Sequence, residues 1–176
     1  MSEIPNTLTQ QQHRAALRQA YEQNPANDTL RKALLKSMRP KFIQQAAKRG
    51  VFICYAMPDG VFALNLALAL REVGIRAFLD ELEADDDMDW GDTVNQALRD
   101  CAVLVMVLSP DGVEDAEVTA EYTYFMKKGK IIIPVIAENC FMTGFETVLE
   151  PLNFVDDYDE SLTQLKSMLT TQEANA

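Results

Sequence analysis

The stretch AVLVMVLSPDGVEDAEVTAE at residues 102–121 decides the fold of this chain. Its first part, residues 102–108, is an unbroken run of aliphatic and β-branched side chains, which is typical of a strand buried on both faces of a sheet. The sequence Ser-Pro-Asp-Gly at 109–112 then ends the strand and begins an acidic loop. Strands of this kind belong to parallel sheets that helices cover on both sides.

A helix is expected after this loop, because Val118, Glu121, Tyr122 and Phe125 recur at helical spacing. Glu121 would then lie on or beside the apolar stripe of the helix. A carboxylate in that position has two readings. It is a functional group held against the core, or it is a charge that the helix dipole favours near the N-terminus.

Composition excludes several classes of partner. The chain has 176 residues, of which 48% are hydrophobic, and this length and content suit one domain with a modest extension. With 27 acidic and 16 basic side chains the net charge is -11, which argues against nucleic acid or an anionic membrane as a partner. Residues 1–11 form no signal peptide and no run is long enough to span a membrane, so we expect a cytoplasmic protein.

The cysteines Cys54, Cys101 and Cys140 show no paired spacing. We therefore expect reduced core residues rather than a disulfide frame or a metal site. The acidic run at 81–89 is likewise interpreted as a solvated loop and not as a cation site, since its carboxylates lack ligand spacing. No metal ligand is predicted.

Alternating strand and helix patterns begin near residue 50. Residues 1–49 are predicted to be a helical N-terminal extension, either a docking or oligomerising appendage or a hairpin packed on the domain, and residues 171–176 a disordered tail. Strands are expected at 51–55, 75–79, 102–108, 131–136 and 153–155, and helices at 61–73, after Trp90, around Glu121 and at 161–169. Pro134 predicts an edge position or a bulge.

Strands that alternate with helices imply right-handed crossovers and a parallel sheet. The predicted fold of residues 50–170 is therefore α/β, a flavodoxin-like doubly wound five-stranded parallel sheet. In such a sheet a ligand binds outside the carboxyl ends of the strands. We expect the loops at 56–60, 80–89 and 109–121 to converge there, with Tyr55, Ala56, Asp59 and Asp80 lining a pocket and Ser109 at its floor.

Six motifs in order resemble a Toll/interleukin receptor (TIR) domain of the bacterial kind. The resemblance covers residues 50–167, and the family's fold is the five-stranded sheet just described. The motifs are FICYAMPDG at 52–60, FLD at 78–80, DW and VNQAL around Trp90, VLVMVLSP at 103–110, VTAE at 118–121 and GKIIIPVI at 129–136. In this family position Trp90 usually packs under the loop, so we interpret it as structural.

The resemblance implies a function. Many bacterial members are NAD+ nucleosidases of immune or stress systems, such as antiviral defence, and Glu121 matches the position of their catalytic glutamate. They cleave NAD+ to nicotinamide and ADP-ribose or to a cyclic ADP-ribose signal. A fixed carboxylate beside the ribose stabilises the sugar cation that forms in this hydrolase reaction. NAD+ would be the substrate and no cofactor is needed; Tyr55, Ala56, Asp59, Asp80, Ser109 and Tyr122 would contact it.

Two departures from the family leave an alternative open. Active bacterial members often carry tryptophan where this chain has Glu117, so a stacking surface is missing unless Tyr122, Tyr55 or Trp90 supplies one. The acidic loop at 81–89 would repel the pyrophosphate of NAD+ if it faced the pocket. The alternative is a catalytically silent module for TIR–TIR interaction in signalling. The resemblance also implies homo-oligomers with other TIR domains on activation.

A phosphorylated receiver domain is excluded by the ends of the strands. A receiver needs paired acids after its first strand and an aspartate at the end of its third. Here the first strand ends at Cys54 and Tyr55, and the third ends at Ser109.

Overall fold

The computed structural model describes residues 19, 23, 40–79, 90–147 and 149–170. The chain divides into two compact units, Met1–Arg39 and Pro40–Ala176, and all the strands described belong to the second. Apart from residues 19 and 23, which are helical, the helices predicted before Pro40 lie outside the described residues, as do the acidic loop with Asp80 and the predicted tail. The side chain of Trp90 lies outside them as well.

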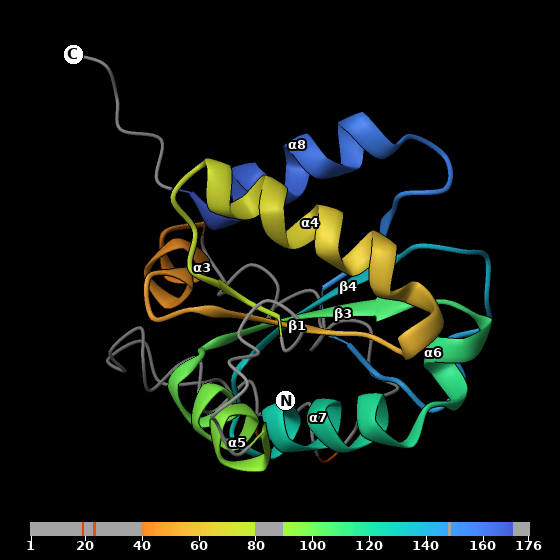
Figure 1. The fold of residues 1–176 in the computed structure, drawn as a ribbon, viewed down its shortest axis with the longest axis horizontal. Coiled ribbons are helices and arrows are strands. Elements are labelled where there is room, and N and C mark those ends of the chain that lie inside the picture. The colour runs from red at the N-terminus through yellow and green to blue at the C-terminus, as the bar shows by residue number, and fades with distance from the viewer. Residues whose placement is uncertain (1–18, 20–22, 24–39, 80–89, 148, 171–176) are drawn as a thin grey trace, which may run out of the picture. The chain divides into compact units, whose positions relative to one another are not determined.

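The second unit is built on a five-stranded sheet in the order β2-β1-β3-β4-β5, and every pair of neighbours is parallel (Figure 1). The strands are β1 (Val51–Cys54), β2 (Ala77–Phe78), β3 (Val103–Leu108), β4 (Ile131–Ile136) and β5 (Leu152–Asn153). This order is that of the flavodoxin-like class, so the predicted fold is confirmed. The outer strands are shorter than predicted.

Helices cover both faces of the sheet (Figure 1). On one face lie α3 (Pro40–Ala47), α4 (Gly60–Glu72) and α8 (Tyr158–Leu169), and on the other lie α5 (Trp90–Asp100) and α7 (Ala116–Lys127). The sequence analysis did not predict α3 as an element. Its Ile43 and Ala47 are buried in the same cluster as Leu66 of α4 and Leu165 of α8.

Strand β3 is buried at every position, as predicted for a strand covered on both faces. Its alternate side chains supply the two halves of the core. Val103, Val105 and Val107 pack toward α4 and α8, whereas Leu104 and Met106 pack with α5 and α7.

Pro134 lies in an interior strand, and the prediction of an edge position or a bulge is wrong. It pairs with Met106 in the register of β3 and β4, and β5 continues the sheet on the other side. Ile131 and Ala137 donate their backbone N–H groups toward β3, so alternate residues face that strand and Pro134 faces away from it. Because β5 begins to pair only at Val135, proline's missing N–H leaves no ladder bond unmade.

Two helix starts differ from the prediction because side chains cap them. Residues 110–114, predicted as loop, form the short helix α6 (Pro110–Glu114), with Ser109 as its N-cap and proline in its first position. Helix α8 begins at Tyr158 and not at Ser161, because the carboxylate of Asp157 accepts a hydrogen bond from the backbone of Glu160 at 2.9 Å. Among the helices described, none has the length and apolar character needed to cross a membrane.

Candidate functional site

The candidate site lies where the chain order of the strands reverses. Strands β1 and β3 are neighbours, and the chain leaves them for opposite sides of the sheet. The loops after such a pair diverge and form the usual ligand crevice of a doubly wound sheet. Here these loops are the 3-10 turn η1 (Met57–Asp59) with the preceding Ala56, and the helix α6, and the two contact each other.

A hydrogen-bonded pair joins the two loops. The Ser109 hydroxyl donates to Asp59 Oδ2 at 2.5 Å and accepts from the Gly112 backbone N–H at 2.9 Å. Ser109 is fully buried, and its two hydrogen bonds hold η1 and α6 together at this edge of the sheet. A Cβ on Gly112 would meet the carbonyl oxygen of Val107 at 2.9 Å, which is why this turn requires glycine.

The first turn of α7 is fixed against the end of β1. The Cys54 thiol donates to the Val118 carbonyl oxygen at 3.7 Å. The side chain of Asp115 caps the same turn, accepting from the backbone N–H groups of Glu117 at 2.9 Å and Val118 at 3.0 Å. Glu121 follows one turn later and is half-buried, so it lies beside the apolar stripe as predicted.

Tyr122 belongs to the buried stripe of α7. Its hydroxyl donates to the Glu146 carbonyl oxygen at 2.7 Å and accepts from the Glu146 N–H at 2.9 Å. Its ring meets Phe145 edge-on, with the centroids 5.0 Å apart. Tyr122 therefore ties α7 to the segment before β5, and its ring and hydroxyl are engaged in packing.

Tyr55 and Ala56 point to different faces of the sheet. Tyr55 is half-buried and packs with the cluster on the α4 side, whereas Ala56 is buried in the cluster that includes α7. Successive residues of an extended chain alternate in this way. Asp59 and Ser109 meet where η1 contacts α6, Ala56 directly precedes η1, and Tyr55 lies on the face of the sheet opposite Glu121.

A cavity of about 670 Å³ opens beside α6 at the same edge of the sheet. It is lined by Pro110, Val113 and Glu114 of α6, by Ile136 at the end of β4, and by Asn139, Cys140, Phe141 and Thr143 in the loop that follows. The sequence analysis missed this second wall. The rule that loops after parallel strands meet at one edge applies to the loop after β4 too.

Cys140 packs against the core cluster on the α7 side but is only half-buried and lines this cavity, so its assignment from sequence as a core residue holds in part. Burial raises the pKa of its thiol, and the nearby carboxylates of Asp59 and Glu138 raise it further. The thiol is therefore protonated at neutral pH and is a poor nucleophile. Cys54 and Cys101 are buried, as predicted.

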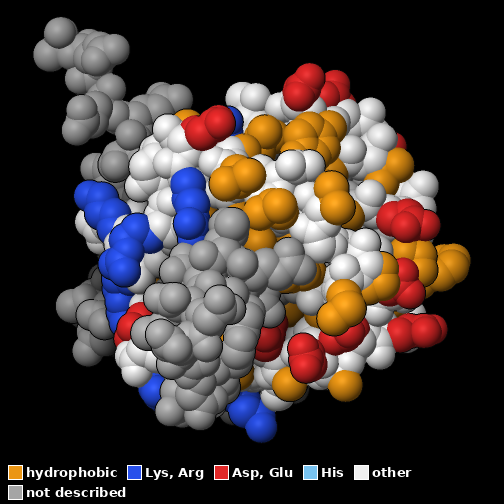
Figure 2. Space-filling view, in the orientation of Figure 1, with side chains coloured by type: hydrophobic (Ala, Val, Ile, Leu, Met, Phe, Trp, Pro, Cys, Tyr) orange, Lys and Arg blue, Asp and Glu red, His pale blue; other side chains and the backbone are white. Residues whose placement is uncertain are grey.

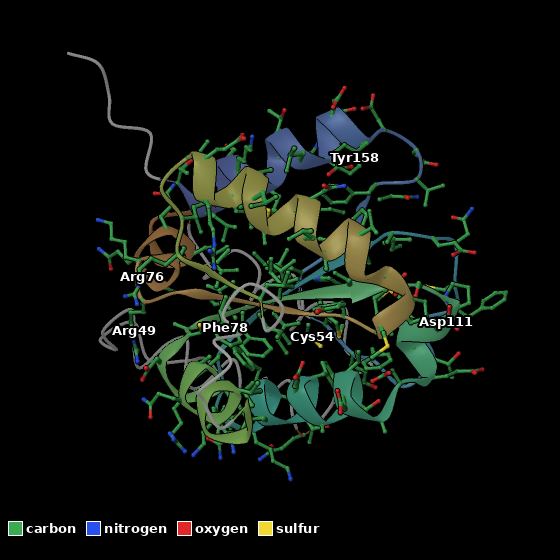
Figure 3. All side chains as sticks on the ribbon, viewed as in Figure 1. Arg49, Cys54, Arg76, Phe78, Asp111 and Tyr158 are labelled. Carbon is green, nitrogen blue, oxygen red and sulfur yellow. The ribbon has the colours of Figure 1, made fainter. Side chains whose placement is uncertain are left out.

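Large apolar side chains are exposed around this edge. Met57 is 86% exposed, Val61 75% and Phe141 89%. Figure 2 shows hydrophobic side chains across the viewed side of the molecule and out to its right margin, with carboxylates among them at that margin. In Figure 3 Asp111 of α6 lies at one end of the molecule, with Arg49 and Arg76 at the other.

Two residues that the sequence analysis considered at or near the pocket have no described side chain. Asp80 and the side chain of Trp90 lie outside the described residues. Within the described part of the chain, no three His, Cys, Asp or Glu side chains are grouped to hold a metal ion. Glu121 does not line the cavity beside α6.

These features define a flavodoxin-like α/β domain in which the segments after β1 and β3 meet at the switch point of the sheet, with a cavity beside α6 at the same edge. The family model described as TIR domain matches residues 51–166, and the chain belongs to the TIR domain family. A similar solved structure is the TIR domain of the Toll-related receptor TRR-2 from the lower metazoan Hydra magnipapillata. It has a TM-score of 0.55 and 20% identity, covering 65% of this chain and 92% of that one, so the two share the fold. Among curated proteins no match is found.

Proposed function

We propose that the domain is an NAD+ nucleosidase that releases nicotinamide and forms ADP-ribose or a cyclic ADP-ribose signal. The observation that carries the proposal is the setting of Glu121. It is a half-buried carboxylate on α7, one turn after the carbonyl that the Cys54 thiol binds at the end of β1. The product would act as a signal in a prokaryotic immune or stress response such as antiviral defence, within the cytoplasm.

The chemistry needs a carboxylate of this kind. Nicotinamide leaves NAD+ as a neutral base, so the departing group requires no general acid. The positive charge that develops on the ribose is stabilised by a carboxylate held in place before the reaction. Asp59 is held by the buried Ser109 hydroxyl at the same edge of the sheet, and its second oxygen is suited to a ribose hydroxyl.

The test compares two carboxylates of one helix. Purified protein is incubated with NAD+ at high concentration, with a crowding agent, and the products are separated by chromatography. Glu121→Gln is expected to lower the rate of nicotinamide release by about a hundredfold. Glu117→Gln, an exposed change of the same charge on the same helix, should leave the rate within about twofold. Equal rates for the two variants, or no release by the wild type, would overturn the proposal.

A second candidate function is a catalytically silent module that binds other TIR domains. The exposed side chains of Met57, Val61 and Phe141 favour it, because apolar groups gathered at one edge mark interaction surfaces. TIR domains generally interact with other TIR domains. The engaged ring of Tyr122 and the exposed Glu117 at the usual tryptophan position favour it too, since neither offers a stacking face.

Light scattering separates this candidate from the first. Phe141→Ser is expected to raise the concentration needed for self-association by about tenfold, since each buried aromatic anchor contributes strongly to an interface. Leu68→Ser, an exposed position in the middle of α4, is the control and should change little. Association that depends on Phe141 in a protein without NADase activity would favour the silent module. Association unchanged by Phe141→Ser would reject this surface.

A further inference from the structure

A second cavity lies at the opposite edge of the sheet, where the strands begin. Its volume is about 1000 Å³, at the upper end of the usual range for ligand sites. Three of its lining residues lie just before strands: Gly50 directly precedes β1, Arg76 directly precedes β2, and Cys101 lies shortly before β3. Figure 3 places Arg49 and Arg76 at the end of the molecule away from Asp111, so this cavity is separate from the β1–β3 crevice.

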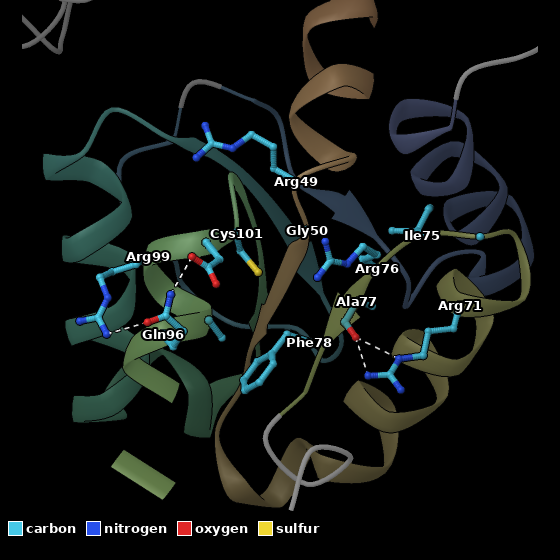
Figure 4. Close-up of a pocket in the computed structure, with 13 residues that line it drawn as sticks. Arg49, Gly50, Arg71, Ile75, Arg76, Ala77, Phe78, Gln96, Arg99 and Cys101 are labelled. Atoms are coloured by element: carbon cyan, nitrogen blue, oxygen red, sulfur yellow. Dashed lines mark hydrogen bonds between the residues drawn. The ribbon is translucent and has the colours of Figure 1, made fainter. Parts of the chain in front are cut away.

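The lining of this cavity is basic, although the chain as a whole is acidic. It includes Arg49, Arg71, Arg76 and Arg99, and Asp100 is its one carboxylate among the described residues (Figure 4). The complete chain carries a net charge of -11. A cluster of arginines in such a chain creates a local positive potential that attracts anions.

Two of these arginines are engaged in the fold. Arg71 donates through Nε at 3.0 Å and through a terminal nitrogen at 2.7 Å to the Ala77 carbonyl oxygen of β2. Arg99 donates to Gln96 Oε1 at 3.0 Å. Arg49 and Arg76 are exposed, and within the described part of the chain neither side chain makes a hydrogen bond or an ion pair. No described residue therefore occupies their guanidinium groups.

The backbone that carries Arg49 and Arg76 is held firmly. The Arg76 carbonyl oxygen accepts from the Val51 N–H at 2.8 Å, and the Gly50 carbonyl oxygen accepts from the Ala102 N–H at 3.1 Å. Gly50 has a φ of 120°, and a Cβ there would lie 3.0 Å from the sulfur of Cys101. The floor of the cavity beside Arg49 is therefore bare backbone that is already held in place. Binding a ligand there costs little conformational entropy of the protein.

Part of the wall is flat and apolar. Phe78 is half-buried, and its ring stacks on Phe52 with a centroid distance of 5.1 Å and an interplanar angle of 20°. Ile75 and Ala97 line the same cavity. A bound peptide strand does not fit this edge well, because Arg71 already occupies the Ala77 carbonyl. The wall suits a planar ring better than a strand.

The neighbouring ionisable groups strengthen the positive potential. Burial and the nearby guanidinium of Arg49 lower the pKa of Lys130, whose ammonium donates to the Cys101 carbonyl oxygen at 2.7 Å. Burial raises the pKa of the Cys101 thiol to about 11, although Lys130 and Arg76 lie near it. The thiol thus adds no negative charge at neutral pH. An anion beside Arg49 would relieve the repulsion between Arg49 and Lys130.

We propose that this cavity is a second binding site for nucleotides, separate from the β1–β3 crevice. Arg49 and Arg76 bind the phosphate groups, and Phe78, Ile75 and Ala97 contact the base. Arginine suits this task because its planar donors match phosphate oxygens in pairs. The site is independent of the proposed NADase activity, since it uses no residue of that crevice.

Isothermal titration of the full chain at low salt tests this site with ATP and with inorganic pyrophosphate. Both should bind, and ATP should bind more tightly because its base meets the apolar wall. Arg49→Gln and Arg76→Gln should each weaken both ligands by about tenfold, the loss expected for a hydrogen bond between charged groups. Lys127→Gln, an exposed change of the same charge on α7, is the control and should leave both affinities within about twofold.

Phe78→Leu separates the base from the phosphates. It should weaken ATP several-fold and leave pyrophosphate unchanged, and retained pyrophosphate binding shows that the variant is folded. If Phe78→Leu does not fold, Gln96→Glu is measured in its place. This substitution at an exposed position adds a carboxylate to the rim of the cavity and should weaken the binding of both ATP and pyrophosphate. No binding of ATP at about millimolar concentration, or no difference between the arginine variants and Lys127→Gln, would overturn the proposal. Equal affinity for ATP and for a glutamate-rich peptide would overturn the nucleotide assignment.

Discussion

Ser109→Ala tests how the β1–β3 crevice is held together. Ser109 caps α6 through the Gly112 N–H and also binds Asp59 of η1. Loss of the cap costs about 1 kcal/mol of the free energy of unfolding. A hydrogen bond to a charged group contributes about 1.5 to 3 kcal/mol, and the lower end applies because Asp59 is half-exposed and water can replace its partner. We expect a total loss of about 2.5 kcal/mol.

Urea denaturation measures this loss, and a second cap is the matched control. Asp115 caps α7 by accepting from the backbone of Glu117 and Val118, and within the described part of the chain its carboxylate bonds to no other loop. Asp115→Ala should therefore cost only about 1 kcal/mol. In an Asp59→Ala background the loss of unfolding free energy caused by Ser109→Ala should also fall to about 1 kcal/mol. The difference is a coupling energy between the two side chains of about 1.5 kcal/mol. If Ser109→Ala costs no more than Asp115→Ala, the bond to Asp59 does not stabilise the crevice.

Three further predictions concern stability. Gly112→Ala should lower the free energy of unfolding by about 1 to 2 kcal/mol in urea, because the contact of its Cβ with the Val107 carbonyl at 2.9 Å outweighs the helix propensity of alanine; a variant as stable as the wild type would contradict this. Burial raises the pKa of the Cys101 thiol from 9.0 to about 11, so the folded state favours the protonated thiol. This contribution to the free energy of unfolding is fully present below pH 9 and is lost as the pH rises toward 11. The wild type should therefore lose roughly 2 kcal/mol more than Cys101→Ala over this window, and parallel stability curves would count against it. Lys130→Met should lower the free energy of unfolding by about 1 to 2 kcal/mol, because the Lys130 ammonium donates to three carbonyl oxygens at the end of α5. Lys127→Met, at an exposed position, should be nearly neutral. Equal losses in the two variants would rule out the capping role of Lys130.

Much of the fold could be predicted because its signals are local. The apolar run that became β3 is buried at every position, and β4 begins and ends where the pattern indicated. The stripe of α7 was also predicted correctly, since Val118, Tyr122 and Phe125 are all buried. The helix α6 was missed because five residues show too little periodicity, although the Ser-Pro start is a helix signal.

The sites depend on contacts between residues far apart in the chain. The sequence placed Asp59 and Ser109 near one edge, because the carboxyl ends of parallel strands meet there. Only the tertiary structure showed that they share a hydrogen bond, that Tyr55 and Ala56 diverge, and that Cys140 faces a cavity. The catalytic role of Glu121 remains a prediction.

The sequence by itself therefore determined most of the elements, the class of sheet and the edge at which the segments after β1 and β3 meet. The position of Pro134 and the basic cavity were decided by strand order and register. Proline is accepted in β4 because β5 pairs only beyond it, and Arg49 and Arg76 become neighbours of one cavity because β1 pairs with β2. Hydrophobic periodicity records which face of an element is buried, but it carries no information on which element covers that face.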